Sequence, residues 1–524
     1  MANSSPYAFL AGCFLSVLVM AVMPTGALAQ QEEDAKAAEK PAEKGRPTPS
    51  PKEESSVTEH TLKIGGQTIP YKATAATILL KNEKDEPTAL VYYTSYLRTD
   101  TKEISQRPLS FLYNGGPGSA SLWLHMGAFG PRRVVTADAA PTSPAPYRMT
   151  ENASSLLDKS DLVFIDPVGT GFSHAVGKAQ DKDFWGVDQD VRSLAQFITT
   201  YVNRTNRWNS PKFLIGESYG TFRSAALSNY LQNHDGLYFN GISLISSVLD
   251  LGSLSFSPGL DLPYVFYLPS YTATAWYHKV LKERPENLQA FLQEARNFAQ
   301  TEYATALMKG TALSSAEKTE LAKKLSRFTG LSEDYLLKAN LRVSLSQFRE
   351  ELQRSRGLTT GRIDARYTGY TYDLLSEYAE YDPQMSAVTG AFTAAFNNYV
   401  RDELKFGQDK PYHAISEGVG RNWDWKHESR ERGFFPGAPS VTGDLIQALL
   451  TNPHLQVEVE NGWFDLATPF FATEYTMDHL ALPEKLRENI HLQYYNAGHM
   501  MYLRDDELGK LKANITKLMD AAHR

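Results

Sequence analysis

A strand, a tight turn and a small-residue helix follow one another directly in this chain, and they constrain its fold more than any other feature. Residues 213–215 are apolar, residues 216–220 are Gly-Glu-Ser-Tyr-Gly, and small residues follow. In this G-x-S-x-G pattern a serine occupies the apex of a strained turn above a sheet. The flanking glycines remove the Cβ atoms that would clash where strand and helix meet. The pattern predicts that Ser218 is a nucleophile.

The first 57 residues have the composition of a leader and a linker. Residues 1–29 contain an apolar run and then small residues before Gln30, which is typical of a secretory signal peptide. The apolar run continues past Cys13, which favours a signal peptide over a lipoprotein box. Residues 30–57 are rich in Glu, Lys, Ala and Pro, so we expect a disordered linker. These features predict an exported protein, either in a bacterial periplasm or secreted.

The composition argues against several kinds of partner. Cys13 is the only cysteine, so the mature chain has no disulfide and no thiolate metal site. The net charge of −7 gives no reason to expect nucleic acid. No later segment reaches the roughly 18 apolar residues of a membrane span. His427-Glu428 lacks the second histidine of a zinc protease motif, and we expect no metal and no cofactor.

Strands and helices alternate through the first half of the mature chain, residues 58–251. After a β-meander, the apolar patterns predict strands at 108–113, 161–166, 213–215 and 242–246, and an amphipathic helix at 186–204. Short apolar strands that alternate with helices are typical of a parallel sheet covered on both faces. The sequence therefore predicts an α/β fold.

This alternation is interrupted and then resumes. Residues 252–440 are mainly helical by pattern, with helices expected at 281–299, 316–325 and 335–352. We interpret this stretch as a cap inserted over the carboxyl edge of the sheet. Strands return at 455–461 and 490–495, so residues 441–524 should complete the core.

A serine nucleophile requires a base, and the base requires an acid that orients it. The loop after the strand at 455–461 offers Asp465, and the loop after the next strand offers His499. Asp478 and Asp505 are also near in sequence, and we interpret both as solvated helix charges. The order Ser, acid, His is that of α/β-hydrolases.

The Gly-rich loop after Tyr113 supplies a second element of such a site. An oxyanion needs two backbone donors, and the serine turn provides the N–H of Tyr219. Gly115 and Gly116 allow backbone to approach a substrate carbonyl closely. We expect this loop to provide the other donor.

Four motifs in this order resemble the serine carboxypeptidases over residues 108–503: Asn114-Gly-Gly-Pro-Gly118, Asp166-Pro-Val-Gly-Thr-Gly-Phe-Ser173, Gly216-Glu-Ser-Tyr219 and Gly498-His-Met500. The resemblance, to a bacterial, disulfide-free branch, implies an exported serine-type carboxypeptidase that cleaves C-terminal peptide bonds of peptides through an acyl-enzyme. It implies the following site residues: Ser218, Asp465 and His499 as the triad, Gly116 and Tyr219 as the oxyanion hole, and Asn114 and Glu217 as ligands of the substrate's terminal carboxylate.

The role of Glu217 also has a physical requirement. A carboxylate facing another carboxylate must share a proton with it, which predicts an acid-shifted optimum. The alternative is that Glu217 is a packed structural residue.

The chain departs from eukaryotic members of the family at three places. They usually have Trp where Leu112 stands, Cys-Ser in place of Ser119-Ala120, and Ala-Gly in place of Gly220-Thr221. These changes remove part of the site for the terminal carboxylate and the disulfides that usually hold the cap, but they leave the triad unchanged.

Two other functions remain open on this scaffold: an esterase or acyltransferase, and a catalytically inactive envelope binding protein. In the cap, we interpret Arg362, Asp364 and Arg366 as an internal ion-pair network, with substrate contact as the alternative. The sequence carries no signal for oligomeric state.

Overall fold

A computed structural model describes residues 51–428 and 437–522. The described residues all belong to one compact unit, Ser50–Arg524. The predicted signal peptide and residues 30–50 of the predicted linker lie outside the described part. Among the helices of the described ranges, none combines the length and apolarity needed to cross a membrane.

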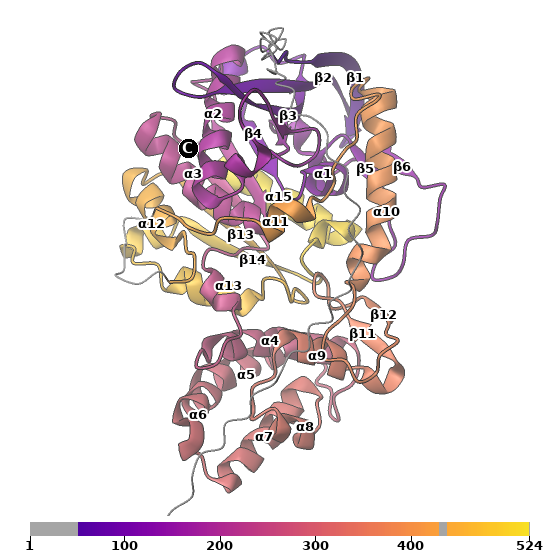
Figure 1. Cartoon of the computed structure of the whole chain (residues 1–524), viewed down its shortest axis with the longest axis vertical. Coiled ribbons are helices and arrows are strands. Elements are labelled where there is room, and N and C mark those ends of the chain that lie inside the picture. Colours follow the sequence, from indigo (N-terminus) through magenta and orange to yellow (C-terminus); the bar gives the residue numbers. More distant parts are fainter. Residues whose placement is uncertain (1–50, 429–436, 523–524) are drawn as a thin grey trace, which may run out of the picture. The chain divides into compact units, whose positions relative to one another are not determined.

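A ten-stranded sheet lies in the upper part of this unit in the view of Figure 1. Its order is β1-β2-β3-β7-β4-β9-β10-β13-β14, and β8 pairs with β3. The six strands from β7 to β14 in this order are parallel, and β1, β2 and β3 extend them as antiparallel strands. The strands are β1 (Ser55–Ile64), β2 (Gln67–Lys81), β3 (Pro87–Arg98), β4 (Leu109–Tyr113), β7 (Asp161–Ile165), β8 (His174–Ala175), β9 (Lys212–Glu217), β10 (Gly241–Ile245), β13 (Gln456–Gly462) and β14 (Ile490–Tyr495). The predicted mostly parallel α/β sheet is confirmed.

Helices cover both faces of this sheet. On one face pack α2 (Val187–Thr205), α3 (Tyr219–His234) and α12 (Thr442–Thr451), and on the other α1 (Leu122–Leu124), α10 (Pro383–Asn398) and α15 (Asp505–Ala521). Strands buried on both faces need mostly apolar side chains, which explains why β4, β7 and β9 are apolar at most positions and buried along their whole length. Although α10 lies in the range predicted as cap, its Phe392 belongs to the same apolar cluster as Leu112 of β4.

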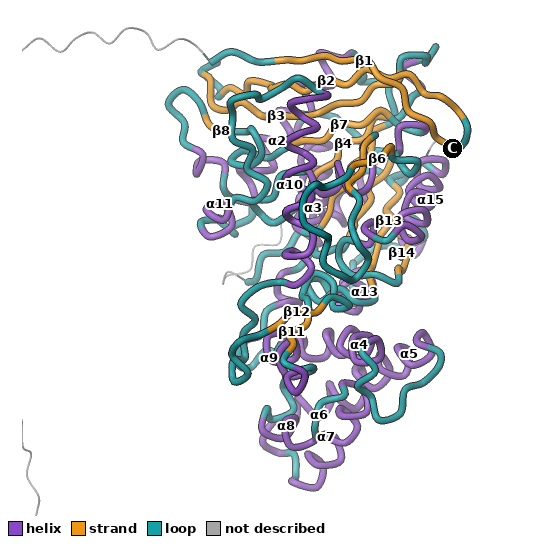
Figure 2. The backbone as a smooth tube through the Cα atoms, turned by 90° about the vertical axis from the view of Figure 1, so that its right-hand side faces the viewer, coloured by secondary structure: helices purple, strands orange, loops and turns teal. Residues whose placement is uncertain are grey.

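A separate group of helices packs around a third apolar cluster, below the strands in Figure 2. These helices are α4 (Leu262–Tyr277), α5 (Leu288–Phe298), α6 (Ala304–Lys309), α7 (Ser315–Thr329), α8 (Glu333–Lys338) and α9 (Leu345–Glu351). The cluster also contains Trp463 and Phe464 after β13, and Phe470 of α13 (Phe470–Asp478). These helices are thereby attached to the loop that carries Asp465.

The predicted single helix at 335–352 is wrong, because the chain breaks between α8 and α9. Asn340 and Leu341 have φ of 48° and 63°, in the left-handed region that ends a helix. Ser344 then caps α9, since its hydroxyl accepts from the N–H of Gln347 (3.4 Å). The remaining short elements are β5 (Arg132–Val134), β6 (Met149–Glu151), β11 (Leu358–Thr360), β12 (Thr368–Tyr370), α11 (Glu417–Arg421) and α14 (Glu484–Arg487).

The sheet begins earlier than the predicted end of the linker at residue 57. Strand β1 starts at Ser55 and pairs with β2 as far as Ile64. Just before it, Glu53 forms an ion pair with Arg204 of α2 (2.8 Å). The long edge of β2 presents unpaired N–H and C=O groups that need a partner strand. Pairing with this edge orders residues that composition alone assigns to a linker.

Candidate active site

Ser218 occupies the turn between β9 and α3. Its φ of 59° and ψ of −129° are rare for a non-glycine residue, and such strain costs on the order of 1–3 kcal/mol. The turn is held because the N–H of Ser218 donates to the carbonyl of Ile245, at the end of β10 (2.9 Å). Ser218 is half-buried, whereas Glu217 and Tyr219 are buried. The fold thus leaves the serine accessible at the carboxyl edge of the parallel sheet.

Glycines allow the loop after β4 to lie directly against this turn. A Cβ on Gly115 would lie 2.4 Å from the nitrogen of Tyr219, and one on Gly216 would lie 2.3 Å from the carbonyl oxygen of Gly220. Gly116 has a φ of 105°, which residues with a side chain avoid. The two predicted oxyanion donors, the N–H groups of Gly116 and Tyr219, therefore lie on segments in contact.

His499 and Asp465 come from the loops after β14 and β13, and their side chains are hydrogen-bonded. The distance from His499 Nδ1 to Asp465 Oδ2 is 2.7 Å. The buried carboxylate also accepts from the N–H groups of Ala467 (2.7 Å) and Thr468 (2.9 Å) and from the Thr468 hydroxyl (2.7 Å). Burial disfavours the imidazolium, but the charges of Asp465 and Glu217 outweigh it and raise the pKa of His499. Because Nδ1–H points to the carboxylate, Nε2 is the nitrogen left to accept a proton.

The other two acids considered in the sequence lie on the surface. Asp478 is exposed at the end of α13. Asp505 is 84% exposed at the start of α15 and pairs with Arg133. Of the three acids, Asp465 is the one that contacts His499.

Glu217 is buried beside Asn114 and Tyr502. The Tyr502 hydroxyl donates to Glu217 Oε2 (2.7 Å), and the Asn114 side chain hydrogen-bonds the same carboxyl. Asn114 is itself fixed, since its Oδ1 accepts from the N–H of Leu124 (3.0 Å). Burial raises the pKa of Glu217 to about 7, against the opposing influence of His499. Glu217 can therefore gain or lose a proton in the neutral range.

Two further residues support this site and carry no motif of their own. Tyr502 follows His499 by three residues, in the short 3-10 helix Met501–Leu503, and this spacing is its only sequence signal. Arg223 is buried in α3, where it donates to the carbonyl of Asn114 (2.8 Å) and to Asp190 (2.6 Å). The sequence feature that could have identified Arg223 is its isolated charge in a helix of mostly small and apolar residues.

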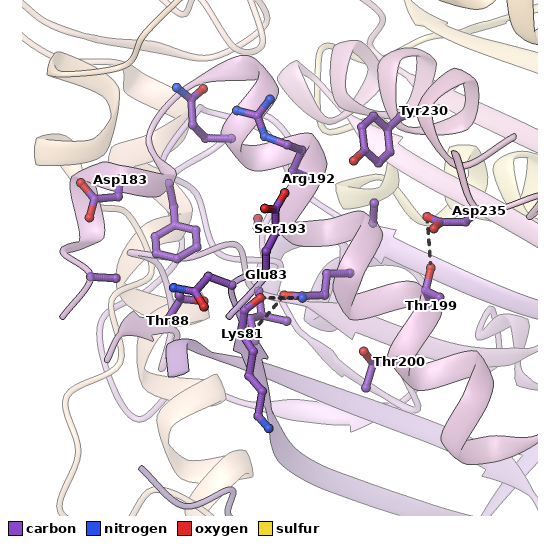
Figure 3. Close-up of a pocket in the computed structure, with 17 residues that line it drawn as sticks. Lys81, Glu83, Thr88, Asp183, Arg192, Ser193, Thr199, Thr200, Tyr230 and Asp235 are labelled. Atoms are coloured by element: carbon purple, nitrogen blue, oxygen red, sulfur yellow. Dashed lines mark hydrogen bonds between the residues drawn. The ribbon is translucent and has the colours of Figure 1, made fainter. Parts of the chain in front are cut away.

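A cavity of about 740 Å³ lies along α2, apart from these residues (Figure 3). It is lined by β2 and the turn after it, by Thr88 of β3, by residues within 179–184, and by α2, α3 and Asp235. None of the candidate catalytic residues lines it. The candidate chemistry therefore lies at the sheet edge and not in this cavity.

A family model of the serine carboxypeptidases matches residues 72–523. The chain belongs to the serine carboxypeptidase family.

Curated relatives match shorter segments of this family member. Pheromone-processing carboxypeptidase KEX1 of Saccharomyces cerevisiae is 29% identical over 167 residues, which cover 29% of this chain and 21% of the relative. Serine carboxypeptidase-like 45 of Arabidopsis thaliana is 24% identical over 211 residues, which cover 38% of this chain and 42% of the relative. The chain thus spans less than half the length of these relatives.

The fold of the family is also found in solved structures. The crystal structure of the prohormone-processing carboxypeptidase KEX1 from Saccharomyces cerevisiae superposes with a TM-score of 0.55 at 18% identity. The match covers 86% of this chain and 91% of that chain. The expected α/β-hydrolase fold is confirmed.

Main-chain pairing connects the Gly-rich loop of this family member to the segment after α10. Ser119, where eukaryotic members have Cys, forms a β-bridge with Ile415. Alongside, the N–H of Ala120 donates to the carbonyl of Ala414 (3.0 Å), and the N–H of Ser416 donates to that of Gly118 (2.7 Å). Hydrogen bonds therefore join these segments without a disulfide.

The predicted ion-pair network in the cap is confirmed for two of its three members. Arg366 contacts Asp364 (2.6 Å) and Asp138 (3.0 Å) and is buried. Asp364 also accepts from the N–H of Gly498 (3.1 Å), directly before His499. This pair therefore supports the histidine loop, whereas Arg362 is exposed.

Proposed function

We propose that this protein is an exported serine-type carboxypeptidase that removes C-terminal residues from peptides through an acyl-enzyme. The observation that carries the proposal is the 2.7 Å hydrogen bond between His499 and Asp465, on loops at the same sheet edge as the accessible Ser218. The names of the curated relatives, two carboxypeptidase descriptions, support the same reaction class. Export to a bacterial periplasm or the medium is supported by the signal-peptide pattern of residues 1–29.

The proposed reaction begins with attack by Ser218 Oγ on the carbonyl carbon of the C-terminal peptide bond. His499 Nε2 takes the hydroxyl proton, and Asp465 stabilises the resulting imidazolium. The N–H groups of Gly116 and Tyr219 bind the oxyanion. His499 then protonates the leaving amine as the C–N bond breaks. Water attacks the acyl-enzyme with His499 again as base, which releases the shortened peptide and restores the serine.

Glu217 and Asn114 are the proposed ligands of the substrate's terminal carboxylate. Two facing carboxylates repel unless one is protonated, and a carboxyl with a pKa of about 7 takes that proton readily. The side chains that hydrogen-bond Glu217, those of Tyr502 and Asn114, are neutral, so they add no charge that would repel or neutralise the substrate carboxylate. This arrangement favours a free acid over an amide or ester at the substrate terminus.

The proposal is tested with a peptide and its C-terminally amidated twin, followed by mass spectrometry. Stepwise loss of terminal residues, faster from the free acid, is the expected result. Hydrolysis of esters without cleavage of either peptide would identify an esterase or acyltransferase instead. Failure of a fluorophosphonate to label Ser218 would favour an inactive binding protein.

A further inference from the structure

Arg362 has a side chain unlike those of its charged neighbours in the cap loop. Asp364 and Arg366 are buried and paired with each other, whereas Arg362 is exposed. Within residues 51–428 and 437–522, no carboxylate forms an ion pair with its guanidinium. An exposed arginine without an ion-pair partner is available to an anion from outside the chain.

The main chain of Arg362 is fixed to both loops that carry the candidate acid and base. Its carbonyl accepts from the N–H of Leu466 (3.1 Å), which directly follows Asp465. The next carbonyl, of Ile363, accepts from the N–H of His499 itself (2.8 Å). The main chain at Arg362 and Ile363 is therefore hydrogen-bonded to the loops that carry Asp465 and His499.

The main chain at Arg362 and Ile363 is also bound by a residue outside the catalytic loops. Asp382, the N-cap residue of α10, accepts from the N–H groups of Arg362 (2.6 Å) and Ile363 (3.2 Å). Asp382 also lies 3.7 Å from Arg349, so its charge is shared with a second arginine.

The charge of Arg362 acts on His499. It opposes protonation of His499, although burial and the charges of Asp465 and Glu217 have the larger influence on that pKa. It also acts on Tyr267 of α4. Because charge interactions weaken with distance, the guanidinium is near enough to His499, Tyr267 and Arg349 for its charge to act on all three.

We propose that Arg362 is a specificity-determining residue whose guanidinium binds the side-chain carboxylate of an Asp or Glu next to the scissile bond. This inference rests on the proposed carboxypeptidase function. That function already assigns the terminal carboxylate to Asn114 and Glu217, so an acidic side chain is the anion left for Arg362. A guanidinium suits this role because it pairs with a carboxylate through two parallel hydrogen bonds.

The inference is tested with four N-acylated peptides. Two carry Glu or its isostere Gln at the last position, and two carry Glu or Gln at the penultimate position. At one of these positions, kcat/KM for Glu should exceed that for Gln by roughly tenfold to a hundredfold, the usual effect of a hydrogen-bonded charge. Arg362→Gln should bring this ratio close to one. Arg362→Glu should instead favour a Lys peptide over the Gln peptide. Because the side chain is exposed, both variants are expected to fold, which circular dichroism checks.

Arg356→Gln is the matched control. Arg356 is another exposed arginine of the cap, hydrogen-bonded to Gln353 (3.3 Å), and its removal should leave the Glu/Gln ratio unchanged. An equal ratio in wild type and Arg362→Gln at both positions would overturn the proposal. A loss in Arg362→Gln confined to the preference for free acid over amide would also overturn it, since the guanidinium would then bind the terminal carboxylate.

Failure of the proposed carboxypeptidase function and failure of the role of Arg362 give different results. If wild type cleaves none of the peptides, the carboxypeptidase assignment fails. The protection of Ser218 against a fluorophosphonate by the Glu and Gln peptides then gives the same comparison without turnover. Stronger protection by Glu in wild type, lost in Arg362→Gln, would support Arg362 as a carboxylate-binding residue, and equal protection would overturn it.

Discussion

Two buried carboxyl groups, Asp161 and Glu217, lie at opposite edges of the same parallel sheet and have different partners. Asp161 begins β7, at the amino edge, and is paired with Arg107 (2.7 Å) and Arg207 (2.6 Å). Glu217 ends β9, at the carboxyl edge, and its hydrogen bonds come from the neutral side chains of Tyr502 and Asn114.

The difference between the two edges is one of charge compensation. At the amino edge the protein neutralises its buried acid with its own arginines, which stabilises the fold. At the carboxyl edge burial raises the pKa of Glu217 to about 7 and leaves the group responsive to an incoming charge. We expect substitutions at the carboxyl edge to change turnover, and substitutions at the amino edge to change stability.

The largest effect is expected from Ser218→Ala. Loss of the nucleophile should lower kcat about a million-fold, as removal of a triad serine does in other hydrolases. The melting temperature should change little, because the hydroxyl contributes no core packing. Peptide turnover and fluorophosphonate labelling measure the effect. Ser228→Ala, which removes another α3 hydroxyl bonded only to a local carbonyl, is the control. Residual labelling of the Ser218→Ala protein at a different serine would contradict the assignment.

Asp465→Asn should lower kcat by roughly ten thousand-fold, because the amide holds His499 in the wrong tautomer. Steady-state kinetics on one free-acid peptide measure this. The exposed acids provide matched controls, and Asp478→Asn and Asp505→Asn should retain near-normal rates. A large loss of rate in either control would place the catalytic acid in another loop.

Asp161→Asn tests the amino edge. It leaves Arg107 and Arg207 buried with one partner fewer, which should lower the free energy of unfolding by about 3–5 kcal/mol. Urea unfolding measures the loss, and kcat/KM of the folded fraction should stay unchanged. Glu53→Gln removes the partly exposed pair with Arg204 and should cost less than about 1 kcal/mol. If Asp161→Asn altered turnover but not stability, the contrast between the two edges would be wrong.

Glu217→Gln tests the carboxyl edge through its pH dependence. In wild type, kcat/KM for a free-acid peptide should fall by up to about tenfold per pH unit above 7, as the shared proton is lost. Glu217→Gln should flatten this limb and weaken binding at acid pH, and an amidated peptide should show the flatter profile with either protein. Four matching profiles would make Glu217 a structural residue.

The same variant has a stability signature with a defined sign. The folded pKa of Glu217, about 7, lies above its ordinary value of 4.5. The stabilisation by the protonated form is therefore complete below the ordinary value and is lost as pH rises through 7. Between pH 5 and pH 8 the melting temperature of wild type should fall relative to that of Glu217→Gln. Other titrating groups are common to both proteins and cancel in this difference.

Much of the fold was predictable because its signals are local. The apolar runs of β4, β7 and β9 appear in the sequence, since strands buried on both faces tolerate few polar residues. The predictions went wrong where a distant partner overrides local composition. Residues 55–57 have a linker composition, but they pair with the edge of β2.

The serine turn and the Gly-rich loop follow from the sequence, because steric limits within a few residues dictate them. Ser218 at a φ of 59° needs Gly216 beside it, and the loop at Gly115 cannot carry a Cβ. Other relations required tertiary contacts. The choice of Asp465 over Asp478 and Asp505 depends on which loop reaches His499. Tyr502 meets Glu217 across 285 residues of chain, and Arg362 lies beside the catalytic loops because its carbonyl and that of Ile363 accept hydrogen bonds from them. Strand order and helix packing bring such partners together. Apart from the three-residue spacing between His499 and Tyr502, no sequence pattern indicates these contacts.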